Sequence, residues 1–323
     1  MKKVLLLFGG SSFEHDISCK SARAIIQNID TKKFDLTICG LDDKNNFYLF
    51  KDDICYLDGD EWLSSEIDKI DNPIEFMKQF DKVFPIIHGS PCEDGKLIGL
   101  LETYNIPYVG SNSLASGIAY NKYYTKLILD KFDIPQVDYE IIINGNKINT
   151  KLEYPLIVKP SSCGSSIGIN IANNKKELVL YVKEAFKYSD SVLVEKYIKK
   201  RELECGILES HSKLIVSSVG EIIPDNGFYD YSSKYEADTR LVVPSSINEE
   251  IQKQVQDYSK KIFKILSLHT YARIDFMYDY NNQILYFNEV NTIPGFTSIS
   301  MYPKMFEDIG ISMKELITRL IEN

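Results

Sequence analysis

Short apolar runs alternate with glycine turns and amphipathic stretches in the first part of the chain. Val4–Phe8 is a continuous apolar run that ends at Gly9 and Gly10, and a helical pattern follows from about Ser18. A buried strand, a glycine turn and a helix form the opening of an α/β unit. The pattern predicts that helix at 18–28, a second helix at 97–104, and strands at 34–41, 82–87 and 108–110. We therefore expect a parallel-sheet α/β domain over residues 1–110, in which the acidic segment 42–80 is irregular.

After residue 110 the pattern changes from α/β to α+β. Residues 111–200 predict one long helix at 115–132, strands at 139–143, 156–159 and 191–195, and another helix at 175–188. Residues 201–323 predict strands at 203–208 and 213–221, a polar loop at 224–243, a helix at 247–266, a hairpin at 273–291 and an amphipathic helix at 307–322. The expected architecture is an α/β and α+β multidomain chain, with domains at 1–110, 111–200 and 201–323.

The hairpin near the end of the chain concentrates polar side chains on one face. Arg273 and Asp275 are two residues apart on its first strand, and Glu289 and Asn291 are two residues apart on its second. Side chains two apart on a strand point to the same face. Asp275 comes opposite Glu289 only if an odd number of residues lies between the paired ends, so we expect a three-residue loop at 281–283.

This face has the chemistry of a metal and phosphate site. Mg²⁺ takes carboxylate and amide oxygens as ligands and leaves positions for water and phosphate oxygens. An adjacent arginine is the usual partner of a planar anion or a transferring phosphoryl group. The hairpin therefore indicates nucleotide chemistry, with an ordinary surface hairpin of solvated charges as the alternative.

A second polar segment reads KPSSCGSSIG from Lys159 to Gly168. Its backbone N–H groups, its hydroxyls and Lys159 are the donors that a loop closing over a polyphosphate needs. It is not the GxxxxGK[ST] loop, which does not occur in this sequence. A simple hairpin turn is the alternative, but the lysine at the end of a strand and the sequence VLVEKY about 30 residues later favour a phosphate-binding loop.

Composition narrows the class of protein. In 323 residues, 44% hydrophobic and 26% charged side chains are ordinary values for a globular chain of two or three domains. The net charge of −9 argues against a general nucleic-acid binder, but not against an anionic nucleotide in a locally basic pocket. The six cysteines lack metal-like spacing, so we expect free thiols in a reducing compartment. Because the first apolar run is short and no apolar stretch approaches eighteen residues, we expect a cytoplasmic protein without a membrane span.

Five ordered motifs give the chain a resemblance to a known family. They read GGSSFEHDIS at 9–18, HGSPCEDG at 88–95, KPSSCGSSIG at 159–168, YSSKY at 231–235 and NEVNTIPGFTS at 288–298. Together with Glu195 they resemble the ATP-grasp superfamily, and within it the D-alanine–D-alanine ligases. The resemblance extends over essentially the whole chain, and it implies an ATP-grasp fold that follows the N-terminal domain.

The resemblance implies an ATP-dependent ligase. In the family reaction, ATP phosphorylates the carboxylate of one D-alanine, and the amine of a second D-alanine attacks the acylphosphate. A tetrahedral intermediate then expels phosphate and leaves D-alanyl-D-alanine for peptidoglycan precursors. The resemblance also implies two Mg²⁺ (or Mn²⁺) ions per site, small-molecule substrates rather than a nucleic acid or a membrane, and a homodimer.

By the same resemblance, each motif residue has an expected role. The catalytic set binds the two D-alanines and stabilises the acylphosphate and the oxyanion; it comprises Glu14, Ser165, Tyr235, Arg273, the backbone N–H of Gly295, and Ser300 with the backbone at Met301. The nucleotide set is Lys122 and Lys159 at the phosphates, Glu195 and Glu202 at the adenine and ribose, Asn288, and Lys234 on a loop that closes over the site and excludes water. The metal ligands are Asp275, Glu289 and Asn291.

Four residues depart from the family pattern. Cys92 and Lys200 stand where glycines are usual, Asn121 replaces an aspartate, and Ile299 replaces a histidine. If the glycine replaced at 92 takes a positive φ, the cysteine there costs stability. None of the four changes removes a metal ligand or Arg273, so we expect an active enzyme. The resemblance leaves the role of His88 open.

Three alternatives stay open. A relative that joins D-alanine to D-serine or D-lactate is the nearest; Tyr235 argues against D-lactate but not against D-serine. The residues EADT at 236–239 moderately favour D-alanine. Another carboxylate–amine ligase is disfavoured by Glu14 and by the segment 298–300. A non-catalytic nucleotide-binding module is expected to have lost a metal ligand or Arg273, and this chain has lost neither.

Overall fold

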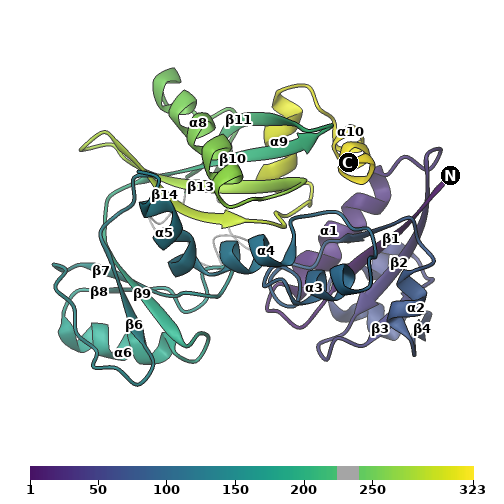
Figure 1. Ribbon diagram of the computed structural model, residues 1–323, viewed down its shortest axis with the longest axis horizontal. Coiled ribbons are helices and arrows are strands. Elements are labelled where there is room, and N and C mark those ends of the chain that lie inside the picture. Colours follow the sequence, from purple (N-terminus) through teal and green to yellow (C-terminus); the bar gives the residue numbers. More distant parts are fainter. Residues whose placement is uncertain (224–239) are drawn as a thin grey trace.

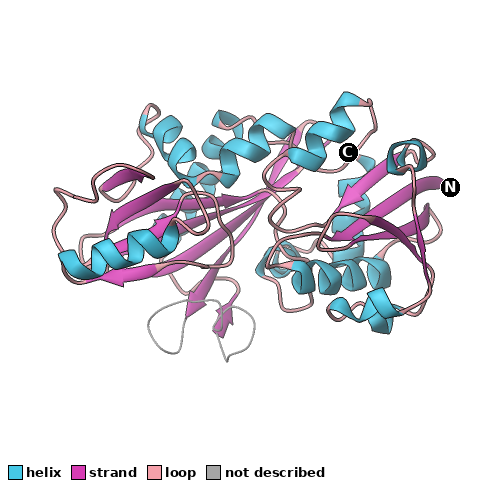
Figure 2. Cartoon of the chain, turned by 90° about the horizontal axis from the view of Figure 1, so that it is seen from below, coloured by secondary structure: helices cyan, strands magenta, loops and turns pink. Residues whose placement is uncertain are grey.

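Three β-sheets organise the described part of the chain, shown in Figure 1. The computed structural model describes residues 1–223 and 240–323. The N-terminal sheet and the sheet built from residues 139–196 lie at opposite ends of the molecule, and the sheet built from residues 201–291 lies between them. Figure 2 shows the same arrangement from below, with helices against the sheet faces. Within the described residues, none of the helices combines the length and hydropathy that a bilayer span requires.

The N-terminal sheet has the strand order β4-β3-β2-β1-β5. Its parallel strands are β1 (Lys2–Gly9), β2 (Phe34–Leu41) and β5 (Lys82–Pro85), and its antiparallel strands are β3 (Phe47–Phe50) and β4 (Ile67–Lys69). The helical segments are α1 (His15–Asn28), η1 (Ile54–Tyr56), η2 (Asp60–Ser64), α2 (Pro73–Met77) and α3 (Lys96–Thr103).

The predicted parallel sheet is present as β1, β2 and β5, but the expectation that segment 42–80 is irregular is wrong, because that segment supplies two antiparallel strands. The turn before β3 is built on Asp42, whose carboxylate accepts the N–H groups of Lys44 (2.9 Å) and Asn46 (2.8 Å). Acidic residues in this segment therefore form a hairpin turn where the sequence suggested irregular chain. The strand expected at 108–110 is reduced to a single bridge to β5.

The second unit begins with two helices, α4 (Ser113–Tyr120) and α5 (Lys122–Asp130). The predicted single helix at 115–132 is wrong, because Asn121 has extended backbone (φ −92°, ψ 99°) and separates them. The side-chain oxygen of Asn121 accepts the N–H groups of Tyr123 (3.1 Å) and Tyr124 (3.2 Å) and so caps α5. Lys122 is therefore the first residue of a helix, where backbone N–H groups favour an anion.

An antiparallel sheet of order β6-β9-β7-β8 completes this unit. Its elements are β6 (Tyr139–Ile143), β7 (Leu156–Pro160), β8 (Asn170–Ala172), α6 (Lys175–Ala185) and β9 (Ser191–Lys196). The strand β8 was not expected; it follows the glycine-rich loop at 159–168 and pairs with β7. This loop therefore connects two neighbouring strands at one end of the sheet.

The third sheet has the order β12-β11-β10-β13-β14. Its strands are β10 (Arg201–Ser210), β11 (Lys213–Ile223), β12 (Arg240–Val242), β13 (Tyr271–Asp279) and β14 (Ile284–Asn291), and its helices are α8 (Glu249–Ile265), α9 (Met301–Asp308) and α10 (Met313–Glu322). The predicted single helix at 307–322 is wrong, because the chain breaks at Gly310, which has a φ of +85°. Of the predicted loop at 224–243, the end forms β12, and residues 224–239 lie outside the described residues.

The hairpin of β13 and β14 has the predicted facing but not the predicted turn. Asp275 lies opposite Glu289, which confirms the pairing argued from the sequence. The connection spans residues 280–283 and is four residues long, so the predicted three-residue loop at 281–283 is wrong. The odd residue is instead Asn288, which forms a β-bulge next to the Asp275–Glu289 pair.

The end of the chain packs on the N-terminal core. Ile293, Phe296 and apolar residues of α10 belong to the same buried cluster as β1 and β5. The rings of Phe84 and Phe296 meet edge to face, with centroids 6.3 Å apart. Lys33 pairs with Glu322 at 2.8 Å, and the two termini lie near each other in Figures 1 and 2. The segment between β14 and α9 is therefore held against the N-terminal sheet.

Candidate active site

A cavity of about 820 Å³ lies where the three units meet. Its lining comes from the start of α1, from the glycine-rich loop, from β13 and β14, and from the segment that leads into α9. A second cavity of about 130 Å³ adjoins it, and Lys122, Ser165 and Glu289 line both. Every predicted site residue in the described part of the chain lines at least one of these cavities. Lys234 and Tyr235 lie outside the described residues.

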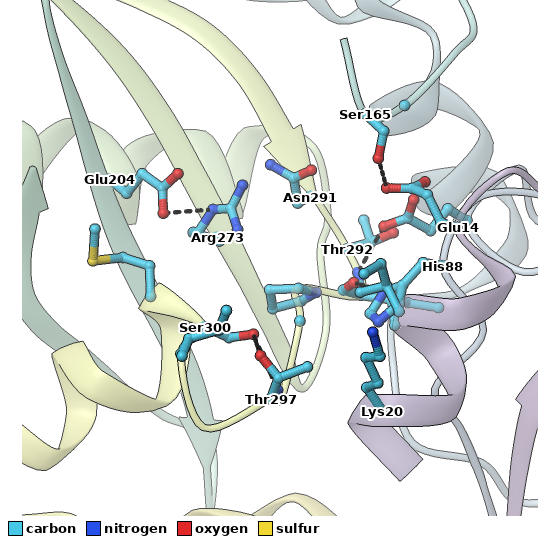
Figure 3. A pocket seen from close by; sticks show the side chains of 18 of the residues that line it. Glu14, Lys20, His88, Ser165, Glu204, Arg273, Asn291, Thr292, Thr297 and Ser300 are labelled. Atoms are coloured by element: carbon cyan, nitrogen blue, oxygen red, sulfur yellow. Dashed lines mark hydrogen bonds and ion pairs between the residues drawn. The ribbon is translucent and has the colours of Figure 1, made fainter. Parts of the chain in front are cut away.

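Arg273 lies within a cluster of carboxylates. Its Nε and one Nη nitrogen donate to the two carboxylate oxygens of Asp275, both at 2.8 Å. Its Nε also lies 3.0 Å from Oε2 of Glu204 on β10, and Figure 3 shows this pair beside Asn291. Asn291 is opposite Arg273 in the ladder and donates to Asp275 at 2.9 Å. These contacts fix the orientation of the guanidinium at the wall of the larger cavity.

Lys122 joins the hairpin to the glycine-rich loop. Its ammonium lies 3.2 Å from Oε2 of Glu289 and donates to the carbonyl oxygen of Cys163 at 2.8 Å. Burial disfavours the charged amine, but the acidic groups around it, with Glu289 the foremost, together raise the pKa of Lys122. The wall shared by the two cavities therefore carries a charged ammonium next to a carboxylate.

A buried ion triad borders the smaller cavity. The carboxylate of Glu195, which is 2% exposed, lies 2.8 Å from Nζ of Lys126 and 2.7 Å from Nζ of Lys159. Lys126 is completely buried, with its Nζ 5.0 Å from the centre of the Tyr139 ring. Burial opposes ionisation, yet the two ammonium groups lower the pKa of Glu195 to about 2. Burial lowers the pKa of Lys159, with Glu195 acting against it. One carboxylate shared by two lysines leaves a positive balance that suits an anionic ligand.

The bulge residue Asn288 lies beside this triad, with its side-chain oxygen 3.3 Å from Nζ of Lys159. Glu202, the other residue expected at the nucleoside, pairs with Lys200 at 2.9 Å. Lys200 is one of the four departures from the family pattern, so its structural effect is a partner for Glu202. Cys92, another departure, does not have a positive φ, although Gly89 nearby does (+70°). The possible backbone strain at Cys92 is therefore absent.

Glu14 connects the N-terminal domain to the glycine-rich loop. Its carboxylate accepts a short hydrogen bond from the hydroxyl of Ser165, as Figure 3 shows. A Cβ at position 164 would lie 2.6 Å from an oxygen of Glu14, so a side chain there would displace the Glu14 carboxylate. The rings of Phe13 and Tyr188 meet edge to face, with centroids 6.2 Å apart, and add a contact between the N-terminal domain and the segment after α6. The loop therefore packs directly on the carboxylate of Glu14, which the family resemblance implies as the partner of a substrate ammonium group.

The segment between β14 and α9 places Gly295 against Ser300. The hydroxyl of Ser300 accepts the N–H of Thr297 (3.0 Å) and hydrogen-bonds to the Thr297 hydroxyl (2.8 Å), as seen in Figure 3. A Cβ at position 295 would lie 2.7 Å from Oγ of Ser300, so a side chain there would displace the Ser300 hydroxyl. Both predicted residues therefore lie in one tight turn at the start of α9.

Several residues at the site had no predicted role. Lys126 follows Lys122 by one helical turn, and Glu204 follows Glu202 by two strand positions, so each shares a face with a predicted residue. That spacing was a usable signal. Other contacts come from residues distant in sequence, such as Ser21, whose hydroxyl accepts the N–H of Phe296 at 3.2 Å. No local pattern in the sequence indicated that contact.

Two family models match the chain in succession. The model described as D-ala D-ala ligase N-terminus matches residues 3–111, and the one described as D-ala D-ala ligase C-terminus matches residues 128–322. The chain belongs to the D-alanine–D-alanine ligase family. The ATP-grasp architecture expected from the sequence is confirmed with it.

Similar proteins match the chain over nearly its whole length. The D-alanine--D-alanine ligase of Acetivibrio thermocellus is 40% identical over 99% of this chain and 95% of its own. That of Clostridium acetobutylicum is 38% identical over 99% of this chain and 97% of its own. Among solved structures, the VanG D-Ala:D-Ser ligase from Enterococcus faecalis has a TM-score of 0.90 at 32% identity, covering 99% and 98% of the two chains. The D-alanine-D-alanine ligase from Coxiella burnetii has a TM-score of 0.83 at 32% identity, covering 99% and 93%.

The D-alanine–D-alanine ligase family is ATP-dependent and requires Mg²⁺. The residues of this site suit the binding of both ATP and Mg²⁺. Asp275, Glu289 and Asn291 offer the oxygen donors that Mg²⁺ prefers. Within the described residues, no three His, Cys, Asp or Glu side chains gather into a metal site of their own. Two carboxylates and one amide suit an ion that completes its shell with water and phosphate oxygens. Lys122 and Lys159 supply the positive charge that those phosphates need.

Proposed function

We propose that the protein joins two D-alanines to D-alanyl-D-alanine for peptidoglycan precursors, converting ATP to ADP and phosphate. The observation that carries this proposal is that one cavity is lined by Glu14, Arg273 and Gly295. A carboxylate suits the ammonium of an amino acid, and a guanidinium suits a carboxyl group that becomes phosphorylated. A backbone N–H in a tight turn suits the oxyanion that forms when an amine attacks. The reaction requires a partner for each of three groups: the ammonium, the carboxyl group that becomes phosphorylated, and the oxyanion.

The first D-alanine binds through its ammonium group to Glu14. Glu14 lies at the N-terminus of α1 and already holds the hydroxyl of Ser165, so the incoming ammonium extends an existing hydrogen-bonded pair. Tyr235, expected in the same subsite, belongs to the residues that the structure does not describe. The carboxylate of this D-alanine then points toward Arg273.

The nucleotide occupies the smaller cavity. Lys122 and Lys159 take phosphate oxygens, while Glu195, Glu202 and Asn288 line the part expected to hold the nucleoside. When bound, two Mg²⁺ (or Mn²⁺) ions held by the hairpin ligands offset the negative charge of the phosphates. Lys234, which the family resemblance implies for excluding water from the acylphosphate, lies outside the described residues.

The second step forms the peptide bond. The neutral amine nitrogen of the second D-alanine bonds to the acyl carbon, the bond from that carbon to the phosphate oxygen breaks and releases inorganic phosphate, and the nitrogen gives up one proton to solvent, so that the amide keeps one N–H. Arg273 and the N–H of Gly295 stabilise the oxyanion between these events. The carboxylate of the second D-alanine binds at Ser300 and the backbone at Met301, the first residue of α9.

A D-alanine–D-serine ligase is the second candidate. It is supported by the likeness to the D-Ala:D-Ser ligase structure from Enterococcus faecalis. The two candidates differ in the product formed from a mixture of D-alanine, D-serine, D-lactate and ATP, analysed by mass spectrometry. D-alanyl-D-alanine as the main product supports the first candidate, and D-alanyl-D-serine as the main product supports the second.

We further propose the three-domain division at 1–110, 111–200 and 201–323, a cytoplasmic location and a homodimer. The division is supported by three separate sheets. The location is supported by the reaction, since ATP and the precursors of peptidoglycan are cytoplasmic metabolites. The dimer rests on family resemblance, and sedimentation of the purified protein tests it.

A further inference from the structure

His88 lies at the edge of the larger cavity and is only 4% exposed. Its Nδ1 lies 2.8 Å from the carbonyl oxygen of Ile293, and its Nε2 lies 3.0 Å from the hydroxyl oxygen of Ser21. A carbonyl oxygen only accepts hydrogen bonds, so Nδ1 must carry a proton and donate it. Both ring nitrogens therefore have protein partners.

Burial of the ring indicates that its other nitrogen, Nε2, carries no proton. Burial lowers the pKa of His88, with Glu14 acting in the opposite direction, and the ring is neutral. Because Nδ1 carries the proton, Nε2 accepts the hydroxyl proton of Ser21. The oxygen of Ser21 in turn accepts the N–H of Phe296 at 3.2 Å. Every donor in this chain of hydrogen bonds therefore faces an acceptor.

These bonds enclose Gly295. His88 holds the carbonyl of Ile293 on one side of it, and Ser21 holds the N–H of Phe296 on the other. Glu93 adds a third attachment by accepting the N–H of Ile293 at 3.2 Å. Figure 3 shows His88 beside the chain that runs from Asn291 through Thr292. The residues that hold this turn come from α1 and from the segment after β5, so the N-terminal domain sets its position.

We propose that Ser21 and His88 are positioning residues that fix the backbone N–H of Gly295 for the oxyanion. This inference rests on the proposed function, which places the oxyanion at Gly295. An oxyanion donor is effective only when it is held about 2.7–3.1 Å from the developing charge. A small displacement of the turn therefore lowers the rate of the chemical step without weakening substrate binding.

The substitution Ser21→Ala tests this role, and Ser217→Ala is the matched control. Ser217 is also completely buried, and its hydroxyl accepts a backbone N–H, that of Gly206, at 2.8 Å, but it lines neither cavity. Each substitution leaves one buried N–H without its acceptor, so both lower stability by a similar amount. We expect Ser21→Ala to lower kcat at least about 10-fold and to leave KM for ATP and for D-alanine within about twofold of the wild-type values. The expected loss in kcat is smaller than the loss caused by removing an oxyanion donor altogether. We expect Ser217→Ala to leave kcat unchanged.

His88→Asn and His88→Ala separate positioning from substrate contact. The Asn side chain can still donate to Ile293, so we expect it to retain more of kcat than Ala. An increase in KM for D-alanine at unchanged kcat in these variants would show that His88 contacts substrate and would overturn the proposal. Unchanged kcat in Ser21→Ala would overturn it as well.

Hydrogen exchange supplies a readout that does not depend on the reaction. We expect Ser21→Ala to raise amide exchange in a peptide covering residues 293–300 and to leave amide exchange in the third sheet unchanged. Ser217→Ala should not change exchange in that peptide. Unchanged amide exchange at 293–300 in Ser21→Ala contradicts the positioning role, whichever substrate the wild-type enzyme uses. A wild-type protein that is inactive with D-alanine contradicts only the proposed function.

Discussion

Asp275 and Glu289 face each other across the β13–β14 ladder because Asn288 bulges out of β14. Because of the bulge, two neighbouring residues of β14 contact different lysines. Asn288 reaches Lys159 at 3.3 Å, and Glu289 reaches Lys122 at 3.2 Å. Bulges commonly re-aim side chains next to functional sites. Here one residue serves the smaller cavity and the next lies on the wall that both cavities share.

Removing a metal ligand should raise the need for Mg²⁺. We expect Glu289→Gln to increase the Mg²⁺ concentration for half-maximal activity at least about 10-fold, because a neutral amide is a weaker ligand. Glu209→Gln, on the same sheet but outside both cavities, is the control and should not change it. Titration of activity with Mg²⁺ gives both values, and equal Mg²⁺ requirements would remove Glu289 from the ligand set.

Removing Arg273 should abolish turnover and leave nucleotide binding. We expect Arg273→Ala to lower kcat by at least about 10²-fold, since it removes positive charge at the oxyanion. ATP binding by calorimetry should persist, because Arg273 lines only the larger cavity. Asp275 and Glu204 lose their shared cation, so circular dichroism should confirm that the variant is folded. Normal turnover in a folded variant would refute the assigned role.

The ion triad makes stability depend on acid pH. The pKa of Glu195 falls from an ordinary 4.5 to about 2, so its contribution to folding is present above pH 4.5 and is lost as the pH falls toward 2. The displacement corresponds to about 3 kcal/mol. We expect Glu195→Gln to lack this part of the decrease in unfolding free energy between pH 4.5 and 2, measured by urea titration at each pH. Parallel curves for the two proteins over this range would contradict the ion triad.

Cys92 should stabilise the turn in which it replaces glycine. It is fully buried and lacks a positive φ, so glycine at this position loses packing and gains only chain entropy when unfolded. We expect Cys92→Gly to lower the unfolding free energy by about 2 kcal/mol. Urea unfolding measures the change, and a more stable glycine variant would show that the cysteine strains the backbone.

The sequence predicted the pairing of β13 and β14 better than the breaks within the helices. Alternation and apolar runs are local, so the facing of Asp275 and Glu289 could be argued from spacing alone. The breaks at Asn121 and Gly310 interrupt amphipathic patterns that continue on both sides, so periodicity could not reveal them. The bulge at Asn288 has the same effect on parity as an odd loop, which is why the facing was right and the turn was wrong.

Local sequence patterns do not predict contacts between segments that are far apart in the chain. His88 and Ile293 are 205 positions apart, and Ser21 and Phe296 are 275 positions apart. Both contacts depend on the packing of the C-terminal segment against the N-terminal core. Motif order brought these regions into one site through family resemblance, but the hydrogen bonds that position Gly295 appear only in the folded chain.

The most direct test of the account is phosphate release by the purified protein with ATP, Mg²⁺ and D-alanine as the only amino acid. We expect steady release, with one D-alanyl-D-alanine formed for each phosphate. Absence of turnover with D-alanine alone, followed by turnover when D-serine or D-lactate is added, would contradict it.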